Sequence, residues 1–307
     1  MKLSKRLFSL MLCAVMIFGF IAGGKINASA AGSGNCGENL TWNLSGSGVL
    51  TVSGTGNMRD FSSDNLPTDA PWYGLRDSIK SIVINDGAEN IGAYAFYYCR
   101  FATNITIPAS VKSIDANAFC GCLSLEKLNI PSGIKSIGEG AFWGCEKLTE
   151  ISVPESVTEI GNRAFEKCYA LKSISFPDKL DSMGDSVCYD CINLVSAKMS
   201  RNHNRIPPET FCYCGSLKTV YIPKNVSAIE ADAFKDCYSI KNVYFEGNAK
   251  TDMDISNSNS YLLNAKWHLN SEMPDNITSE SNLFSEILTA IGNFFRSIAD
   301  FFKNLFS

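Results

Sequence analysis

The amino-acid sequence predicts a solenoid that consists mostly of β-strands with short helical turns, and three observations support this fold class. Four residue types recur every 23 residues in a single register that contains no insertion. Each repeat carries an alternating apolar segment that ends at a proline, as expected for a strand with one buried face. One such repeat cannot bury its apolar edge alone, whereas stacked repeats can, so the fixed period indicates a stack of coils.

The four recurring positions are occupied by phenylalanine, cysteine, proline and isoleucine. The phenylalanine column is interrupted once, by Cys188, and contains Phe96, Phe119, Phe142, Phe165, Phe211 and Phe234. The cysteine column is uninterrupted and contains Cys99, Cys122, Cys145, Cys168, Cys191, Cys214 and Cys237. The other two columns contain Pro108, Pro131, Pro154, Pro177 and Pro223, with Ser200 in the gap, and Ile91, Ile114, Ile137, Ile160, Ile206 and Ile229, with Met183 in the gap. We expect the phenylalanines and the cysteines each to form a ladder through the core.

The repeat that runs from Leu125 to Gly138 illustrates the expected structure of one coil. Its first six residues end in the alternation of a half-buried strand, and Pro131 ends that strand because proline has no N–H to donate. Gly138 is expected to let the chain turn with a positive φ. A short helical turn should follow at Phe142. In the interrupted coil, Cys188 in place of phenylalanine predicts an underpacked spot that costs about 1–3 kcal/mol.

The pattern L-x-x-I-x-I-P-x-x-V-x-x-I-G-x-x-A-F-x-x-C resembles the BspA-type leucine-rich repeat of bacterial surface proteins. The residues that match it closely run from Ile151 through Pro154, Ile160 and Phe165 to Cys168. The resemblance covers residues 76–247, and residues 31–275 when both ends are included. It implies a leucine-rich-repeat solenoid in an exported or cell-surface bacterial protein with a binding or adhesive role, and it implies no particular ligand.

The first 30 residues resemble a secretory signal peptide. Lys2, Lys5 and Arg6 precede an apolar run over residues 7–22, and Ala28-Ser29-Ala30 is a small-x-small cleavage site. The apolar run is short for a membrane-spanning helix, so a retained anchor is the less favoured alternative. These features predict a secreted or cell-surface protein.

Charge argues against nucleic acid as a partner. The chain has 27 basic and 31 acidic residues, and residues 1–30 hold four of the basic residues and no acid. Removal of this segment therefore leaves 23 basic against 31 acidic residues, or a net charge of −8. An acidic protein without a basic run is poorly suited to bind nucleic acid.

The two open ends of a stack need covers, and the sequence predicts both. Residues 31–75 should form an N-terminal β cap, in which residues 40–44 and 49–52 flank a Gly-rich turn as a β-hairpin over the first coil. The repeats are expected over residues 76–247. Residues 248–269 should form an irregular closing coil that contains a strand at residues 265–269. A polar linker is expected over residues 270–281.

Residues 282–307 are predicted to form a C-terminal amphipathic helix. Its apolar face follows i, i+3, i+4, i+7 spacing and includes Phe284, Ile287, Ile291, Phe295, Ile298 and Phe302. Two interpretations remain open: the helix caps the stack or mediates self-association, or it lies on a membrane surface. Its charges cancel, which weakens attraction to anionic lipid. A membrane-associated scaffold tethered through this helix is therefore the alternative function.

The 12 cysteines would suggest disulfides in a secreted protein, but the repeat register argues for a reduced ladder. Neighbouring ladder members lie within disulfide range, yet parallel side chains disfavour the bond geometry. Buried free cysteine behaves as a small hydrophobe. The pairs Cys188-x-x-Cys191 and Cys212-x-Cys214 resemble zinc ligands, but most of them belong to core columns. The sequence leaves open the redox state of Cys36, Cys120, Cys188 and Cys212.

Motifs for catalysis are missing from the sequence. Neither His203 nor His268 belongs to an H-E-x-x-H motif, and the chain has no G-x-S-x-G elbow and no phosphate-binding loop. We therefore predict no enzyme activity, no catalytic residue, no cofactor and no metal site.

The predicted binding surface consists of the residues that flank each buried strand position, because these side chains should face outward. They are the pairs Ser81/Val83, Asn104/Thr106, Lys127/Asn129, Glu150/Ser152, Ser173/Ser175, Ser196/Lys198, Thr219/Tyr221 and Asn242/Tyr244. Uncharged hydrogen-bonding groups beside aromatic rings suit a glycan or an extended peptide. The sequence thus predicts a binding or adhesion module for a protein or glycan, with ligand contacts at Lys198, Thr219, Tyr221, Asn242 and Tyr244.

Overall fold

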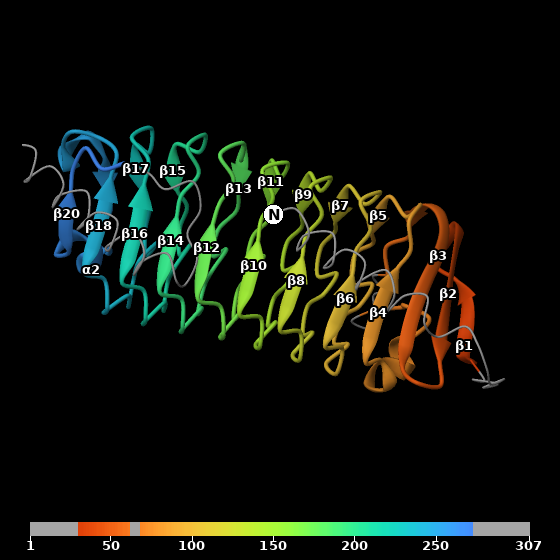
Figure 1. Ribbon diagram of the computed structural model, residues 1–307. Coiled ribbons are helices and arrows are strands. Elements are labelled where there is room, and N and C mark those ends of the chain that lie inside the picture. Colours follow the sequence, from red (N-terminus) through yellow and green to blue (C-terminus); the bar gives the residue numbers. More distant parts are fainter. Residues whose placement is uncertain (1–29, 62–67, 273–307) are drawn as a thin grey trace, which may run out of the picture.

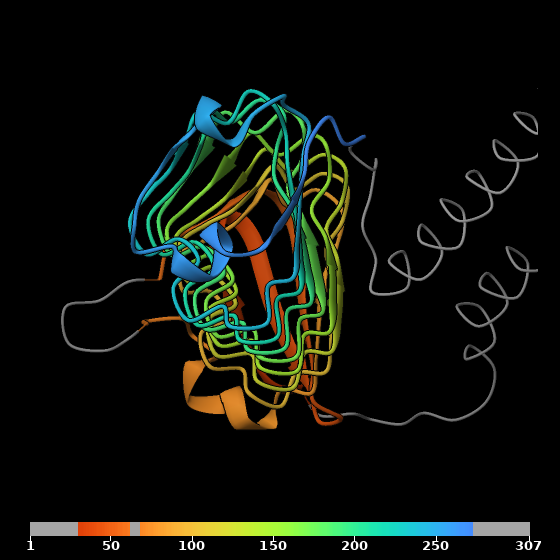
Figure 2. The ribbon, with the colours of Figure 1, turned by 90° about the vertical axis from the view of Figure 1, so that its left-hand side faces the viewer.

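The computed structural model describes residues 30–61 and 68–272 of the chain. The predicted signal peptide, except for Ala30, and the predicted amphipathic helix at residues 282–307 lie outside the described residues. Most of the predicted linker at residues 270–281 lies outside them as well. The described part is a stack of coils whose strands follow one another along a single axis (Figure 1). Viewed along that axis, successive coils superpose (Figure 2).

Each coil contributes one longer strand to one side of the stack. These strands are β4 (Ser81–Ile84), β6 (Asn104–Thr106), β8 (Lys127–Asn129), β10 (Glu150–Ser152), β12 (Ser173–Ser175), β14 (Ser196–Lys198), β16 (Thr219–Ile222), β18 (Asn242–Phe245) and β20 (Lys266–His268). They lie in the three sheets β1-β2-β3-β4-β6, β8-β10 and β12-β14-β16-β18-β20. From β4 to β18 the strands begin at the predicted 23-residue steps, so the repeat register read from the sequence is confirmed.

A second row of two-residue strands follows the longer strands around the coil. It contains β5 (Asn90–Ile91), β7 (Ser113–Ile114), β9 (Ser136–Ile137), β11 (Glu159–Ile160), β13 (Ser182–Met183), β15 (Arg205–Ile206), β17 (Ala228–Ile229) and β19 (Asp254–Ile255). They pair in parallel in two sheets, β5-β7-β9-β11-β13 and β15-β17-β19. The isoleucine column supplies the buried residue of most of these strands, and Met183 supplies it in β13.

The third side of each coil is a turn, and we call residues 94–98 and their equivalents at 23-residue steps the turn wall. In the turns that begin at Tyr94 and at its equivalents up to Glu209, the first, third and fifth N–H groups donate to carbonyls of the next coil, as in Tyr94 to Ala116 at 2.9 Å and Phe96 to Ala118 at 2.8 Å. The first and fifth residues have positive φ, for example 57° at Tyr94 and 55° at Tyr98. Every donor precedes its acceptor along the stack, so all these N–H groups point toward the C-terminal end.

Both ends of this hydrogen-bond ladder are closed by groups from outside the repeats. At the N-terminal end, the Phe61 N–H donates to the Ala93 carbonyl at 2.8 Å, and the Trp72 indole N–H donates to the Ala95 carbonyl at 2.7 Å. At the C-terminal end, the buried Asn259 side chain accepts the Phe234 N–H at 2.8 Å. Since buried backbone groups need partners, these contacts satisfy terminal peptide groups that have no neighbouring coil to pair with.

The prediction that Gly138 turns with a positive φ is wrong, because the glycines with positive φ in this repeat are Gly140 and Gly144. Gly138 instead lies close to the backbone of the preceding coil. A Cβ atom there would lie 2.6 Å from the Ala116 nitrogen. Close approach of one coil to the next therefore explains the glycine.

The phenylalanine column forms the predicted ladder inside the coils. Ring centroids are 5.3 Å apart for Phe96 and Phe119, and 5.5 Å apart for Phe142 and Phe165, with near-parallel planes. Stacking begins in the N-terminal cap, where the Trp72 ring lies 5.6 Å from Phe96.

At Cys188, where the ladder lacks a ring, the same coil carries another phenylalanine. Phe176 occupies the strand-end position that is Ile130 and Val153 in the two preceding coils, and its ring lies 6.4 Å from Phe211. Both Phe176 and Cys188 are fully buried. The extra bulk at position 176 therefore lies next to Phe211, in the coil where Cys188 leaves the ladder without a ring. The underpacked spot expected from the sequence stays a prediction.

The cysteine column also forms the predicted reduced ladder. All 11 cysteines among the described residues are buried free thiols, including Cys36, Cys120, Cys188 and Cys212. Six ladder thiols donate to a carbonyl of the preceding coil, such as Cys145 Sγ to Phe119 O at 3.4 Å. Burial raises the pKa of Cys99 to about 12 and raises the pKa of Cys145 well above its ordinary value of 9.0. The column thus joins coils by weak hydrogen bonds as well as by packing.

The N-terminal cap contains the predicted hairpin and one strand more. β2 (Gly37–Ser45) and β3 (Val49–Met58) pair antiparallel, and β1 (Ala30–Asn35) adds to β2. β3 then pairs in parallel with β4, which places the hairpin on the first coil as expected. The 3-10 helix η1 (Tyr73–Ser78) follows before the repeats begin.

The C-terminal coil loses the 23-residue register, as predicted. Ala228 pairs with Asp254, whereas Asn242 pairs with Lys266, so the two strand rows advance by different steps. The 3-10 helix η2 (Lys250–Asp252) lies in the lengthened segment before β19, and the short helix α2 (Ser260–Leu263) lies between β19 and β20. β20 is the predicted closing strand and pairs in parallel with β18.

Candidate functional site

The predicted binding surface is formed by the outward side chains of the longer strands from β4 to β20, which we call the strand face. On β6, β8 and β10 the central residue is buried and both flanking residues are exposed, as the alternation predicts. These exposed residues are Asn104, Thr106, Lys127, Asn129, Glu150 and Ser152. The Lys127 ammonium lies 3.6 Å from the Glu150 carboxylate across neighbouring strands. This part of the strand face is an open polar surface.

The expectation of exposure is wrong farther along the strand face, where all residues of β14 and β16 are buried. Lys198 is 1% exposed and Tyr221 is 8% exposed. Lys198, Tyr221 and Tyr244 are register partners on successive strands, so their long side chains lie side by side. Each of these side chains covers part of its neighbour, which explains part of the burial. The Lys198 ammonium also lies 3.8 Å from an Asp178 carboxylate oxygen. Thr219, another predicted contact, is buried with them.

An aromatic stack closes the strand face at its C-terminal end. Tyr221 and Tyr244 stack with centroids 5.1 Å apart, and Tyr244 stacks on His268 at 4.6 Å. His268 Nε2 lies 3.0 Å from the Asn242 side-chain oxygen. Desolvation and the nearby Lys266 lower the pKa of His268, so its imidazole stays neutral at pH 7. The structure therefore places all five predicted contacts on the neighbouring strands β14, β16 and β18, and His268 joins them because β20 adds to the sheet.

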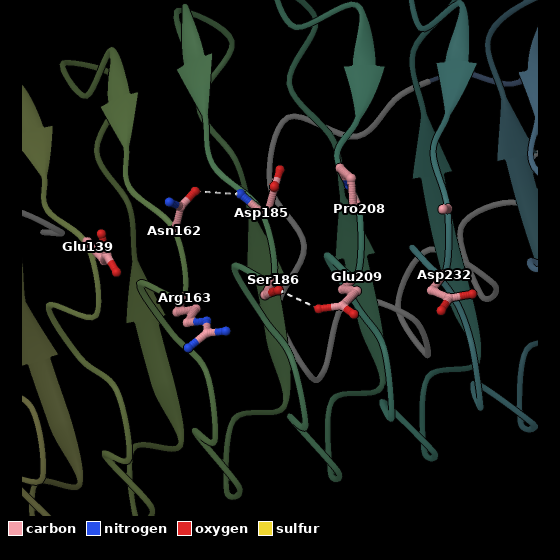
Figure 3. A pocket seen from close by; sticks show the side chains of 9 residues that line it. Glu139, Asn162, Arg163, Asp185, Ser186, Pro208, Glu209 and Asp232 are labelled. Atoms are coloured by element: carbon pink, nitrogen blue, oxygen red, sulfur yellow. Dashed lines mark hydrogen bonds between the residues drawn. The ribbon is translucent and has the colours of Figure 1, made fainter.

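A groove of about 600 Å³ lies on another side of the stack and was not predicted. It follows the segment between the short strands and the turn wall across successive coils (Figure 3). The side chain of Ser186 donates to Glu209 at 2.9 Å, and the Asn162 side-chain oxygen accepts the Asp185 N–H at 2.9 Å. Its charged residues are Glu139, Arg163, Asp185, Glu209 and Asp232.

This groove carries four carboxylates and one guanidinium, so its field favours positively charged groups. The sequence signal was the variable pair of residues that follows the Ile-Gly element in each repeat. Glu139, Asn162 and Asp185 occupy its first position at 23-residue steps. The residue type at this position varies from coil to coil, so the position does not stand out beside the regular apolar columns that define the repeat.

Within residues 30–61 and 68–272, no group of three or more His, Cys, Asp or Glu side chains is arranged to hold a metal ion. In the same part of the chain, no helix has both the length and the apolar character needed to cross a bilayer.

Comparison with solved structures finds bacterial leucine-rich-repeat proteins. One from Eubacterium ventriosum is 17% identical, with 80% of this chain and 97% of that chain covered and a TM-score of 0.35. The leucine-rich-repeat protein of T. pallidum is 18% identical, with 66% and 87% covered and a TM-score of 0.41. The pneumococcal vaccine antigen PcpA is 15% identical, with 80% and 100% covered and a TM-score of 0.38.

Comparison with curated proteins gives no significant match. The sequence model of the BspA type leucine rich repeat region matches in six copies, over residues 72–169 and 135–264. These matches span well over half of the chain and coincide with the coils from the end of the N-terminal cap to the closing coil. The 23-residue coil, its phenylalanine and cysteine ladders and this match together show that the chain belongs to the BspA-type leucine-rich repeat family.

Proposed function

We propose that this protein is an exported bacterial binding module that uses its strand face to hold an extracellular protein or glycan in an adhesive role. Membership of a family of surface proteins supports an extracellular binding role. The signal-peptide pattern at residues 1–30 supports export. Family membership also favours binding over catalysis.

The single observation that carries this proposal is the row of exposed polar side chains on β6, β8 and β10. Parallel strands repeat about every 4.8 Å, so the same position recurs at that interval along the stack. An extended peptide or an oligosaccharide presents hydrogen-bonding groups along its length and can follow such a row. The stack of Tyr244 and His268 adds partly exposed aromatic surface at the end of this row.

The buried thiols are compatible with a life outside the cell. Thiolate is the reactive form of cysteine, and oxidising surroundings favour disulfides. Burial favours the thiol form of most ladder cysteines, for example by raising the pKa of Cys237 and of Cys145. Cys191 is the exception: burial raises its pKa, but hydrogen bonds with Cys188 and Cys214 outweigh burial and lower the pKa to about 5. All the ladder thiols are buried, and this burial limits the access of oxidants.

The test measures binding of the purified chain to a panel of glycans and host-matrix proteins. We expect a ligand whose affinity falls in the double variant Lys127→Ala/Asn129→Ala and in Tyr221→Ala/Tyr244→Ala. Tyr238→Ala is the matched control, because Tyr238 is 70% exposed and lies off the strand face. Equal binding by all three variants and the unaltered protein would refute a strand-face site.

A further inference from the structure

A second cavity, of about 270 Å³, lies on the turn wall near the N-terminal end of the stack and is lined by aromatic rings. Tyr94, Tyr97 and Tyr98 line it from one coil, and Trp143 lines it from the coil two steps farther along the stack. We call these four residues the aromatic slot. Tyr97 and Trp143 occupy the same repeat position two coils apart. The coil between them places the smaller Cys120 at that position.

The spacing of the coils is compatible with one ring between Tyr97 and Trp143. Two coil steps amount to about 9.6 Å at the spacing of parallel strands. A ring held between two others needs about 7–8 Å, because optimal carbon–carbon contacts are about 3.5–4.0 Å. The volume of the slot is just below the range of pockets for drug-sized ligands, so it suits a single small ring.

The tyrosine side of the slot is firmly built. Ring centroids lie 4.8 Å apart for Tyr97 and Tyr98, and 5.6 Å apart for Tyr94 and Tyr97. Gly121 makes space for Tyr98, because a Cβ atom on Gly121 would lie 2.6 Å from Cδ2 of that ring. Burial is the main cause that raises the pKa of Tyr97 to about 12. Its hydroxyl is a donor at neutral pH, like that of any tyrosine. These three rings therefore pack on one another as a single aromatic surface.

Charges around the slot disfavour both cationic and anionic ligands. The Lys167 ammonium already lies 5.0 Å from the centre of the Trp143 ring, which is where a cationic ligand would bind. Arg163 adds a second positive charge and lies 3.6 Å from Glu166. An anion would meet the carboxylate of Glu139 at the same cavity. The balanced charges favour a neutral ligand.

The polar groups of the slot require that this neutral ligand carry hydroxyl groups. Asn117, Glu139 and Arg163 line the cavity together with the rings. A purely apolar ring would cover these donors and acceptors without pairing them, at a cost of about 1–3 kcal/mol for each buried group. The C–H face of a sugar ring packs on aromatic rings, while its rim carries hydroxyls. We propose that the aromatic slot binds one neutral pyranose ring of a saccharide.

This site lies on the turn wall and is separate from the strand face, so its ligand adds to the proposed function. The aromatic slot would thus recognise neutral saccharides through a single sugar ring, whatever the strand face binds. The two sites can be tested independently, because no residue of the aromatic slot belongs to the strand face.

The test is a ligand-observed NMR titration of the purified protein with neutral methyl pyranosides and short neutral oligosaccharides. Loss of one stacking ring is worth roughly 1–3 kcal/mol per ring, so Trp143→Ala should weaken binding by about tenfold or more. Trp143→Phe keeps a ring and should retain most of the affinity. Tyr97→Leu should weaken binding, whereas the off-slot control Tyr238→Ala should not. Circular dichroism checks that each variant is folded.

Affinity should also be unchanged between low and high salt, because the ligand is neutral. The proposal is overturned if no neutral saccharide binds, or if Trp143→Ala and Tyr97→Leu both bind as well as the unaltered protein. Salt-dependent binding of tetramethylammonium in place of sugars would show that the slot is a cation site. Loss of sugar binding in Tyr221→Ala/Tyr244→Ala, with slot variants unaffected, would assign the sugar to the strand face.

Discussion

The exchange of bulk between Phe176 and Cys188 predicts strong coupling between these two positions. Phe176→Val restores the residue type of the preceding coil but removes four buried side-chain atoms next to Phe211. From the usual cost of large-to-small changes, this should reduce the free energy of unfolding by roughly 2–4 kcal/mol. Cys188→Phe adds a ring to a space that Phe176 already occupies, at a cost of about 1–3 kcal/mol.

The double variant Phe176→Val/Cys188→Phe re-creates the arrangement of the other coils, in which the ladder ring comes from the turn wall. We therefore expect its free energy of unfolding to exceed the value calculated by adding the effects of the two single changes by about 1–3 kcal/mol. The free energies come from urea unfolding followed by circular dichroism, with the slope compared among the four proteins to check for a common unfolded state. Additivity within about 0.5 kcal/mol would refute compensation between the two positions.

Two further predictions concern the end of the stack and its thiols. Asn259→Leu removes the acceptor of the Phe234 N–H and the donor to the Glu230 carbonyl. We therefore expect the free energy of unfolding in urea to fall by about 2–4 kcal/mol, while the exposed control Asn257→Ala leaves it unchanged. A fall below about 0.5 kcal/mol in Asn259→Leu would contradict this. Burial raises the pKa of Cys122 and Cys145 above the ordinary 9.0, so the unfolded chain loses these protons first and stability should fall as pH rises above about 9. In reductant, Cys122→Ala/Cys145→Ala should show a shallower alkaline loss; equal slopes would contradict this.

Much of the fold follows from the sequence because one coil dictates the next. Phe142 and Cys145 repeat at fixed intervals, and a period of 23 residues leaves only a stack in which like residues meet. The hairpin of β2 and β3 was also predictable, since Ser45 to Gly48 forms a short Gly-rich turn between alternating segments. The positive φ expected at Gly138 was wrong because periodicity does not reveal whether glycine serves a turn or a close approach.

The binding surfaces were less predictable because exposure depends on neighbouring coils. Alternation places Lys198 and Ser152 at equivalent positions, yet the first is buried and the second is exposed. The difference arises from the size of the side chains at the same position one coil later, Tyr221 for Lys198 and Ser175 for Ser152. The aromatic slot was unpredictable for a related reason. The repeat register places the smaller Cys120 between Tyr97 and Trp143, but only the structure shows that these side chains line one cavity.

The one-way hydrogen-bond ladder of the turn wall has a consequence for how such a protein changes length. Every internal coil accepts from the coil before it and donates to the coil after it in the same pattern. Duplication or deletion of a whole 23-residue unit would therefore leave every internal joint intact. A change of one or two residues would instead misalign all the joints around it. Trp72 and Asn259 serve joints that exist only at the two ends, so the terminal segments are fixed parts while the middle is free to grow or shrink.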